Sequence, residues 1–305
     1  MAINKYNIKK WYLMLTGQSI LHVNQGIGKY YSVSEVMGYY NDLTEKVIRE
    51  PKLLESSDLP KLKTEKGEIV EFPTAIFQYG LGAYDLFLQT GDEKYLKKVR
   101  QCAEWALSKQ EFNGAWNNFF YIYPEHPFCA MTQGEGASLL VRAYLIFDEP
   151  IYLASAKKAL EFMLKDKFEG GVSSYDGTDD LILLEYSHKS PVMNGWIFAL
   201  WGLTDYLKVD KNTQFETSYI KTIDTLTRKI ENFKCLFWSK YDTSGMLASP
   251  FYHHLHVAQM HAMYDLTKKE CFKEYEERWA KQEKNICCKG LAFVIKVFQK
   301  ILEKE

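Results

Sequence analysis

Two side chains that can transfer protons, Glu185 and Tyr186, lie next to each other in the stretch LLEYSHKSPVMNG. An apolar run ends at this pair, and Asn194 and Gly195 then open a new apolar segment. A carboxylate and a phenol act as general acid or base when they lie within hydrogen-bond reach of the reacting atom. From the residues alone, a helix-capping carboxylate and a wall aromatic are the alternative interpretation.

A second polar group follows at Tyr252, His253, His254 and His256, in the stretch YHHLHVAQ. His253 and His256 are three residues apart, a spacing that allows metal binding on one helix face. No HExxH pattern accompanies them, so we expect no metal here. The histidines are then expected to orient a carboxylate or to serve in packing.

Both groups stand just before the first helix of a repeated unit. Each unit contains an apolar helix rich in small residues, a short acidic turn, a more amphipathic helix and a loop with Gly. The units start near residues 78, 133, 194 and 256, and this period of about 55–60 residues indicates stacked helical pairs. The apolar helices should be buried and the amphipathic ones should face solvent.

Inner helices ringed by outer helices predict an all-α fold, an incomplete α/α barrel (toroid) of repeated helical hairpins. A solenoid of tetratricopeptide type is the alternative, but that repeat is only about 34 residues long. Residues 71–305 are expected to form the barrel as the catalytic domain. Residues 1–70 are less regular and are expected to form a helical or irregular extension packed on it.

In such a barrel the loops before the inner helices gather around one mouth, so their polar residues should converge. The helix N-termini add positive dipole ends, which favour an anionic ligand. Further residues of this kind are Gln78, Tyr79, Thr132, Gln133, Glu135 and His188. Trp116 and Arg142 are candidates to line the groove, although Arg142 within a helix is equally a candidate for an internal ion pair.

Composition narrows the partners and the compartment. The chain has 38 Lys and Arg against 39 Asp and Glu, and this balance argues against general nucleic-acid binding. An aromatic content of 15% suits a carbohydrate groove or a large aromatic core. The sequence has no signal-peptide pattern, no stretch of roughly 18 apolar residues and no CxxC pair. A cytoplasmic protein is the simplest prediction.

The final segment, ICCKGLAFVIKVFQKILEKE, is apolar with lysines at 289, 296 and 300 and is expected to form a last helix. Packing on the barrel is the simpler interpretation. The alternative is peripheral attachment to a membrane surface. The sequence carries no indication of the oligomeric state.

Five segments resemble the C-terminal catalytic domain of the D-glucuronyl C5-epimerases, and they occur in that family's order. They are FPTAIFQYGLGAYD (72–85), MTQGEGASLLVRAY (131–144), EYSHKSPVMNGWIFALWGLTDY (185–206), YDTSG (241–245) and YHHLHVAQ (252–259). The resemblance implies an incomplete α/α barrel that converts D-glucuronate to L-iduronate within a glycan such as heparosan, with no organic cofactor. The implied partner is a uronate-containing polysaccharide or its lipid-linked precursor.

The resemblance also implies roles for individual residues. Inversion at C5 removes a proton next to a carboxylate and returns one from the opposite face, which requires two acid/base groups. Glu185 and Tyr186 match the catalytic pair and are expected to serve one face, and Tyr252 matches the second catalytic tyrosine. Asn194 matches a substrate contact. The remaining residues expected to bind substrate are Gln133, Tyr79, Trp116, His253 and His256.

Two departures from the family pattern affect the expected substrate. Larger family members carry β-rich modules before the helical domain, and we expect residues 1–70 to replace them and leave a more open groove. The family also has a Tyr and a substrate-contacting Arg after the YDTSG-like turn, where this chain continues MLASPFYHH. Tyr39, Tyr40 and Tyr79 are the candidates to compensate. The alternative functions are a non-catalytic uronate-glycan binding protein and a polysaccharide lyase.

Overall fold

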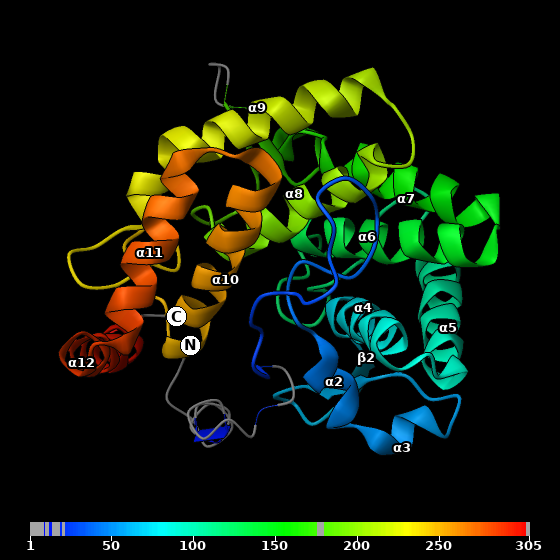
Figure 1. The fold of residues 1–305 in the computed structure, drawn as a ribbon, viewed down its shortest axis with the longest axis horizontal. Coiled ribbons are helices and arrows are strands. Elements are labelled where there is room, and N and C mark those ends of the chain that lie inside the picture. Colours follow the sequence, from blue (N-terminus) through cyan, green and yellow to red (C-terminus); the bar gives the residue numbers. More distant parts are fainter. Residues whose placement is uncertain (1–8, 10–11, 14–18, 20–21, 176–179, 303–305) are drawn as a thin grey trace.

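The computed structural model describes residues 9, 12–13, 19, 22–175 and 180–302. Four helical hairpins follow one another along this part of the chain (Figure 1). Their first helices are α4 (Pro73–Thr90), α6 (Ala130–Phe147), α8 (Met193–Leu207) and α10 (Pro250–Thr267). Their second helices are α5 (Glu93–Lys109), α7 (Pro150–Met163), α9 (Thr213–Lys229) and α11 (Glu270–Lys284).

The first helix of each hairpin is the inner one. In α8 the residues from Met193 to Tyr206 are all buried, whereas α9 buries a single stripe that includes Phe215 and Leu226. The inner helices pack side by side in chain order, with the second helices outside them (Figure 1). The fold is therefore an incomplete α/α toroid of helical hairpins, and the fold class predicted from the repeat is confirmed.

Small residues let the inner helices approach closely. A Cβ on Gly202 of α8 would lie 2.5 Å from the Cα of Gly134 in α6. Only a residue without a side chain allows two backbones to meet at this distance. The small residues scattered among large apolar ones in these helices therefore set the spacing of the toroid.

Two inner helices begin earlier than the sequence repeat suggested. Pro73 and Pro250 are the first residues of α4 and α10, and proline is favoured there because the first helical N–H has no partner in the helix. The hydroxyl of Ser249 accepts a hydrogen bond from the Tyr252 N–H and caps α10. Tyr252 consequently lies in the first turn of its helix.

Two short antiparallel hairpins were not anticipated from the sequence. Strands β1 (Lys61–Lys63) and β2 (Ile69–Glu71) pair, as do β3 (Ser173–Tyr175) and β4 (Leu181–Leu183). The apolar run before Glu185 is thus the buried strand β4. The other elements are α2 (Thr44–Ile48), α3 (Pro51–Leu54), the 3-10 turns Lys167–Glu169 and Ile230–Phe233, and α12 (Ile286–Leu302).

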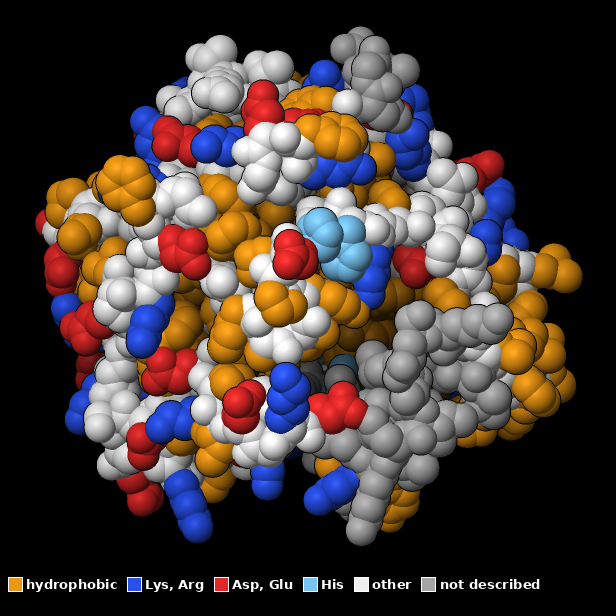
Figure 2. Space-filling view, turned by 180° about the vertical axis from the view of Figure 1, so that it is seen from behind, with side chains coloured by type: hydrophobic (Ala, Val, Ile, Leu, Met, Phe, Trp, Pro, Cys, Tyr) orange, Lys and Arg blue, Asp and Glu red, His pale blue; other side chains and the backbone are white. Residues whose placement is uncertain are grey.

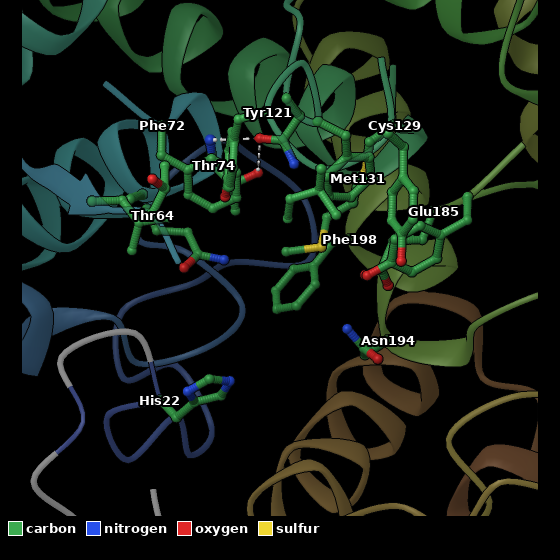
Figure 3. Close-up of a pocket in the computed structure, with 18 of the residues that line it drawn as sticks. His22, Thr64, Phe72, Thr74, Tyr121, Cys129, Met131, Glu185, Asn194 and Phe198 are labelled. Atoms are coloured by element: carbon green, nitrogen blue, oxygen red, sulfur yellow. Dashed lines mark hydrogen bonds between the residues drawn. The ribbon is translucent and has the colours of Figure 1, made fainter. Parts of the chain in front are cut away.

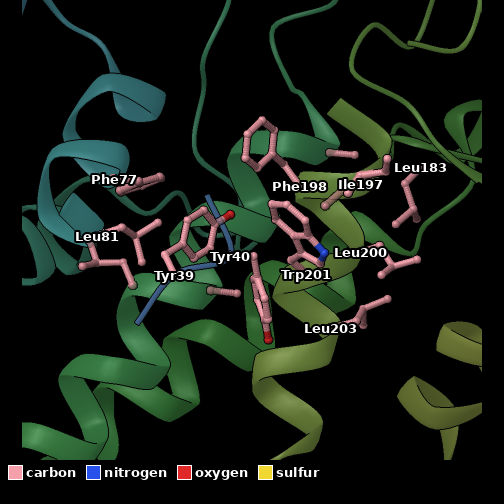
Figure 4. Packing of buried hydrophobic residues seen from close by; sticks show 14 of the residues in the cluster. Tyr39, Tyr40, Phe77, Leu81, Leu183, Ile197, Phe198, Leu200, Trp201 and Leu203 are labelled. Carbon is pink, nitrogen blue, oxygen red and sulfur yellow. The ribbon is translucent and has the colours of Figure 1, made fainter. Parts of the chain in front are cut away.

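The segment before α4 is anchored in the core of the toroid. Tyr39 and Tyr40 are buried, and their rings lie 5.7 and 4.9 Å from that of Trp201 in α8 (Figure 4). Arg142 forms a buried ion pair with Asp205 at 2.6 Å. Tyr39 and Tyr40 are therefore core residues and do not replace substrate contacts, and Arg142 serves the internal ion pair.

The same arginine binds the segment before α4 directly. Its side chain donates to the carbonyl oxygens of Met37 and Gly38 at 2.8 and 3.0 Å. The Tyr40 hydroxyl donates to Asp205 at 2.7 Å. One buried cluster thus joins α6, α8 and the N-terminal segment.

Candidate active site

A pocket with a volume of about 500 Å³ lies at the N-terminal ends of the four inner helices (Figure 3). Helix α4 contributes Thr74 and Gln78, α6 contributes Met131, α8 contributes Asn194 and α10 contributes Tyr252. The segment before α4 and the β1–β2 hairpin close other sides of the pocket. Four helix N-termini meeting at one cavity favour an anionic ligand.

Glu185 is held in the pocket wall by the strand that precedes it. The Leu184 N–H donates to the Val172 carbonyl at 2.8 Å, and the Leu184 carbonyl accepts from the Ala130 N–H at 2.9 Å. The Glu185 side chain is 8% exposed. Its Oε1 atom accepts from the Tyr241 hydroxyl at 3.4 Å, and its Oε2 atom has no hydrogen-bond partner among the residues described. One carboxylate oxygen is thus buried beside the pocket without a hydrogen bond from a described residue.

Burial gives this carboxyl the electrostatics of a general base. Removal from water raises the pKa of Glu185 to about 7, although hydrogen bonds from Tyr186 and Tyr241 oppose the shift. A group with a pKa near the working pH is present in both protonation states and can both take and release a proton.

Three tyrosines surround this carboxyl. Tyr186 stacks on Phe119 with ring centroids 4.9 Å apart, and the rings of Tyr241 and Tyr252 lie 4.8 Å apart. Burial first, and then the negative charge of Glu185, raise the pKa of Tyr186, Tyr241 and Tyr252 above the ordinary value. All three phenols are therefore protonated at neutral pH and available as proton donors.

Asn194 lies on the first turn of α8, on the same side of the pocket as Glu185 (Figure 3). It is 2% exposed, and its carbonyl oxygen Oδ1 has no hydrogen-bond partner within the described ranges. Its backbone carbonyl accepts from the Gln259 side chain at 3.1 Å, which fixes this turn. A buried amide with an unpaired acceptor is suited to bind a ligand hydroxyl.

Glu185, Tyr186, Asn194 and Tyr252 are thus brought together, whereas the other predicted contacts lie elsewhere. Gln133 is fully buried and holds the backbone of Trp116, accepting from its N–H at 2.9 Å and donating to its carbonyl at 3.1 Å. The Trp116 indole donates to the Ala106 carbonyl at 2.8 Å. These two residues fix the loop before α6 and do not line the pocket.

Tyr79 also lies outside the pocket. Successive residues of a helix point about 100° apart, so α4 directs Gln78 into the cavity while Tyr79 enters the hydrophobic core. The tyrosine is 1% exposed. The predicted turn lies at the mouth, and the side chain that it directs to the pocket is that of Gln78.

His253 and His256 are buried behind the site. The ring of His253 stacks on Trp238 at 3.5 Å, its Nδ1 atom accepts from the Ser239 N–H, and Nε2 therefore donates to the Trp279 carbonyl. Burial lowers the pKa of His253 to about 4 and also lowers the pKa of His256. Both are neutral, fully buried residues, and neither lines the pocket. No group of three or more His, Cys, Asp or Glu side chains in the described part of the chain has a metal-binding arrangement.

Several residues in or next to the pocket were not singled out from the sequence. Tyr241 lies in the quoted YDTSG segment, which was the signal available for it, and it links Glu185 to Tyr252. The aromatic run NNFFYIY supplies Phe119, Tyr121 and Tyr123 to the wall. Runs of aromatic residues in a loop are unusual outside binding surfaces, and this pattern was the other usable signal.

Comparison with known proteins agrees with this architecture. The family described as D-glucuronyl C5-epimerase C-terminus matches residues 125–281. A D-glucuronyl C5-epimerase of Caenorhabditis elegans is 27% identical over 216 residues, which cover 61% of this chain and only 35% of that protein. An uncharacterized protein of Methanocaldococcus jannaschii is 24% identical over 207 residues, covering 61% of this chain and 67% of that protein.

A solved structure of a UGL variant with dGlcA-Glc-Rha-Glc is similar in fold. The TM-score is 0.52 with 11% sequence identity, and the match covers 90% of this chain and 82% of that one. At this identity the likeness concerns the fold alone.

Proposed function

The chain belongs to the D-glucuronyl C5-epimerase C-terminus family, and from this premise we propose that it inverts C5 of D-glucuronate residues in a uronate-containing glycan, giving L-iduronate. The observation that carries the proposal is the Glu185 carboxyl in the pocket wall, with Oε2 unpartnered among the described residues and three protonated tyrosines around it. Such a set can remove a proton and supply another without an external reagent.

The protonation states suggest which group acts first on glucuronate. The raised pKa values of Tyr186 and Tyr252 keep both phenols protonated, so neither is a base at neutral pH. Glu185, with a pKa of about 7, is the group that can accept the C5 proton. In this proposal Glu185 takes the proton from one face, and the Tyr252 hydroxyl donates a proton to C5 from the other.

The cycle must then return the proton from Glu185 to the Tyr252 oxygen. The Tyr241 side chain hydrogen-bonds with both, donating its hydroxyl to Glu185 and interacting with the Tyr252 side chain. We assign it the transfer of this proton, which restores both groups without release of product. Tyr186 supports the negative charge that develops on the sugar carboxylate, because a protonated phenol stabilises an oxyanion by hydrogen bonding.

The proposal is tested by incubating the protein with glucuronate glycans, heparosan first, in deuterated water. Deuterium at C5 together with iduronate in the product, both measured by NMR, is the expected result. The Glu185→Gln variant should give neither.

The outcomes separate the alternative functions. A product that absorbs in the ultraviolet, because it contains an unsaturated sugar, would replace the epimerase proposal with a lyase. Tight binding of glucuronate glycans with no deuterium uptake would instead leave a binding protein.

A further inference from the structure

One buried cation in the pocket comes from outside the residues that match the family. Lys46 of α2 lines the cavity and is only 5% exposed, whereas Lys66, the other lysine of the lining, is exposed in the β1–β2 turn. Taking an ammonium out of water is costly, so buried lysines are rare unless a negative group compensates them. The family match covers residues 125–281, so α2 lies before it.

A polar pair from two inner helices accompanies this lysine. Gln78 of α4 donates to Oε1 of Glu135 in α6 at 2.8 Å. Gln78 lines the pocket, and Glu135 is fully buried behind it with no hydrogen-bond partner for Oε2 among the residues described. Lys46 and Glu135 interact electrostatically. Three helices thus bring one ammonium, one amide and one carboxyl to the same wall.

The charge of this group is positive at neutral pH. Burial raises the pKa of Glu135 to about 8 and lowers the pKa of Lys46 to about 8. Burial thus favours the neutral form of the carboxyl, which leaves Lys46 as the cation of this wall. A cation removed from water attracts an anion more strongly than an exposed lysine does.

We propose that Lys46, together with Gln78 of the same pocket and Glu135 behind it, forms the subsite that binds the carboxylate of the uronate substrate. The inference rests on the proposed function and assigns the charged contact to α2, which lies before the stretch that matches the family. An ammonium paired with the carboxylate lowers the energy of the carbanion next to it, so Lys46 acts both in binding and in proton removal.

The test compares Lys46→Met, which keeps an unbranched side chain of similar volume, with Lys52→Met as the control at an exposed lysine of α3 outside the pocket. The probes are a glucuronate-containing heparosan oligosaccharide and the same oligosaccharide with its carboxyls reduced to alcohols. Calorimetric titration measures binding, and deuterium uptake at C5 measures turnover. We expect the wild type to bind the carboxylate form at least about tenfold more tightly than the reduced form.

Lys46→Met should abolish that preference and lower turnover by at least about a hundredfold, whereas Lys52→Met should leave both within about twofold of wild type. Equal affinity of the wild type for the two oligosaccharides overturns the subsite and requires no variant. An active Lys46→Met protein that still prefers the carboxylate form also overturns the subsite, but it leaves the proposed function standing. If the wild type prefers the carboxylate form through Lys46 but shows no turnover, the subsite is supported and the epimerase proposal is overturned. Replacement of a buried charge by Met of similar volume is expected to leave the fold intact.

A different observation concerns the surface of α12. Ala292 is 1% exposed and packs with Trp238 and Ala248, so one face of the helix is attached to the molecule. At other positions of α12, Phe293 is 41% exposed and Phe298 is 59% exposed. Further exposed apolar residues of this helix are Ile286, Leu291, Val294, Val297 and Leu302. Figure 2 shows hydrophobic side chains gathered at this end of the molecule.

The charges around this face are basic. The sequence of α12 contains no Asp or Glu, and Lys289 is exposed on it. The last turn of α11 adds Lys281 and Lys284, which are also exposed. An apolar helix face bordered by lysines complements a membrane surface that carries anionic lipids. No helix in the described part of the chain is long and apolar enough to cross a bilayer.

We infer that α12 lies in the headgroup region of an anionic membrane. Co-sedimentation with vesicles of phosphatidylcholine and phosphatidylserine should retain the wild type, and vesicles of phosphatidylcholine alone should retain at least about tenfold less. The double variant Phe293→Ser and Phe298→Ser should lose binding. Phe112→Ser, at an exposed phenylalanine far along the chain, should keep it. The inference is overturned if the wild type does not co-sediment with anionic vesicles, or if it dimerises through these phenylalanines instead.

Discussion

Gly195 and Glu185 fit against each other so closely that a Cβ on Gly195 would lie 2.5 Å from Oε2 of Glu185 and 2.8 Å from its Cβ. The second residue after the start of α8 therefore has no side chain because the carboxyl occupies that space. This contact explains why the Asn-Gly pair follows Glu-Tyr in the sequence.

Gly195→Ala should move the carboxyl away from its position and lower turnover by about a hundredfold, since a displacement of about 1 Å at a reacting group costs that much. Stability should change little, because alanine favours the helix by about 1 kcal/mol and offsets part of the steric cost. Turnover and thermal unfolding measure the two effects. Gly290→Ala is the control, because nothing lies within 4 Å of a Cβ at that position. Full activity in Gly195→Ala would show that Glu185 does not act at this place.

Glu185→Gln should lose at least about a hundredfold in turnover while gaining stability at alkaline pH. The pKa of Glu185 is about 7 in the folded protein against an ordinary value of 4.5. Between these values the folded state holds more protons than the unfolded state, so wild-type stability falls as the pH rises from about 4.5 to 7. The penalty is fully present above pH 7 and absent below 4.5. Glutamine carries no such penalty.

The free energy of unfolding, measured in denaturant at pH 5 and pH 8, checks this. The variant's advantage over wild type should be larger at pH 8. An advantage that is equal at both values would mean that the carboxyl is ionised in the folded protein at pH 5.

Tyr252→Phe removes one hydroxyl and little volume, so the fold should survive. Inversion should fall by several orders of magnitude, because acid and base groups that act as a unit lose their effect together. Deuterium exchange at C5 with retained configuration should persist through Glu185. NMR of the recovered glycan distinguishes the two. If Tyr252→Phe epimerises at the wild-type rate, Tyr252 is not the proton donor on the face opposite Glu185.

Tyr241→Phe should lower turnover by removing the proposed proton transfer, and should also change Glu185, since Tyr241 donates a hydrogen bond to that carboxylate. The hydrogen bond lowers the pKa of Glu185, so its loss should move the ascending limb of the pH–rate profile to higher pH. A merely structural tyrosine would lower turnover equally at every pH. The full profile between pH 5 and 9 is therefore the measurement.

Arg142→Met should destabilise the protein by about 3–5 kcal/mol, because it leaves the carboxylate of Asp205 buried without its partner. Arg100→Met provides the control. Arg100 pairs with Glu149 at 2.7 Å, similar to the 2.6 Å of the buried pair, but both side chains are about 40% exposed. Solvent screens such an exposed pair, so its loss should cost little stability. Denaturant unfolding of both variants should separate the two costs, and equal losses would contradict this account.

The repeat of small-residue and amphipathic helices was sufficient to predict the toroid. Helices buried on all sides are apolar throughout, whereas helices buried on one face carry a single apolar stripe, and the two sequence patterns differ. The same patterns did not reveal which side chain of a turn enters the pocket. Gln78 and Tyr79 are adjacent in the sequence, and only their rotation about α4 decides that the first faces the cavity.

Residues that act through long-range contacts were the least predictable. Lys46 lies on a five-residue helix, and nothing near it in the sequence signals that α4 and α6 bury it. Gln133 looked like a mouth residue because hydrogen-bonding groups before an inner helix suit both a ligand and a neighbouring loop. Its partner, the backbone of Trp116, becomes apparent only once the chain is folded.

The ion pair of Arg142 and Asp205 also defines where the molecule can be divided. Both residues lie within the stretch that matches the family, yet the carbonyls of Met37 and Gly38 that share the arginine lie well before it. An excised fragment of residues 125–281 would keep the charges and lose two acceptors, together with α4, which covers α6. The stretch that the family model matches is therefore smaller than the part of the chain that folds as one core. A fusion protein that contained residues 125–281 alone would lack part of that core.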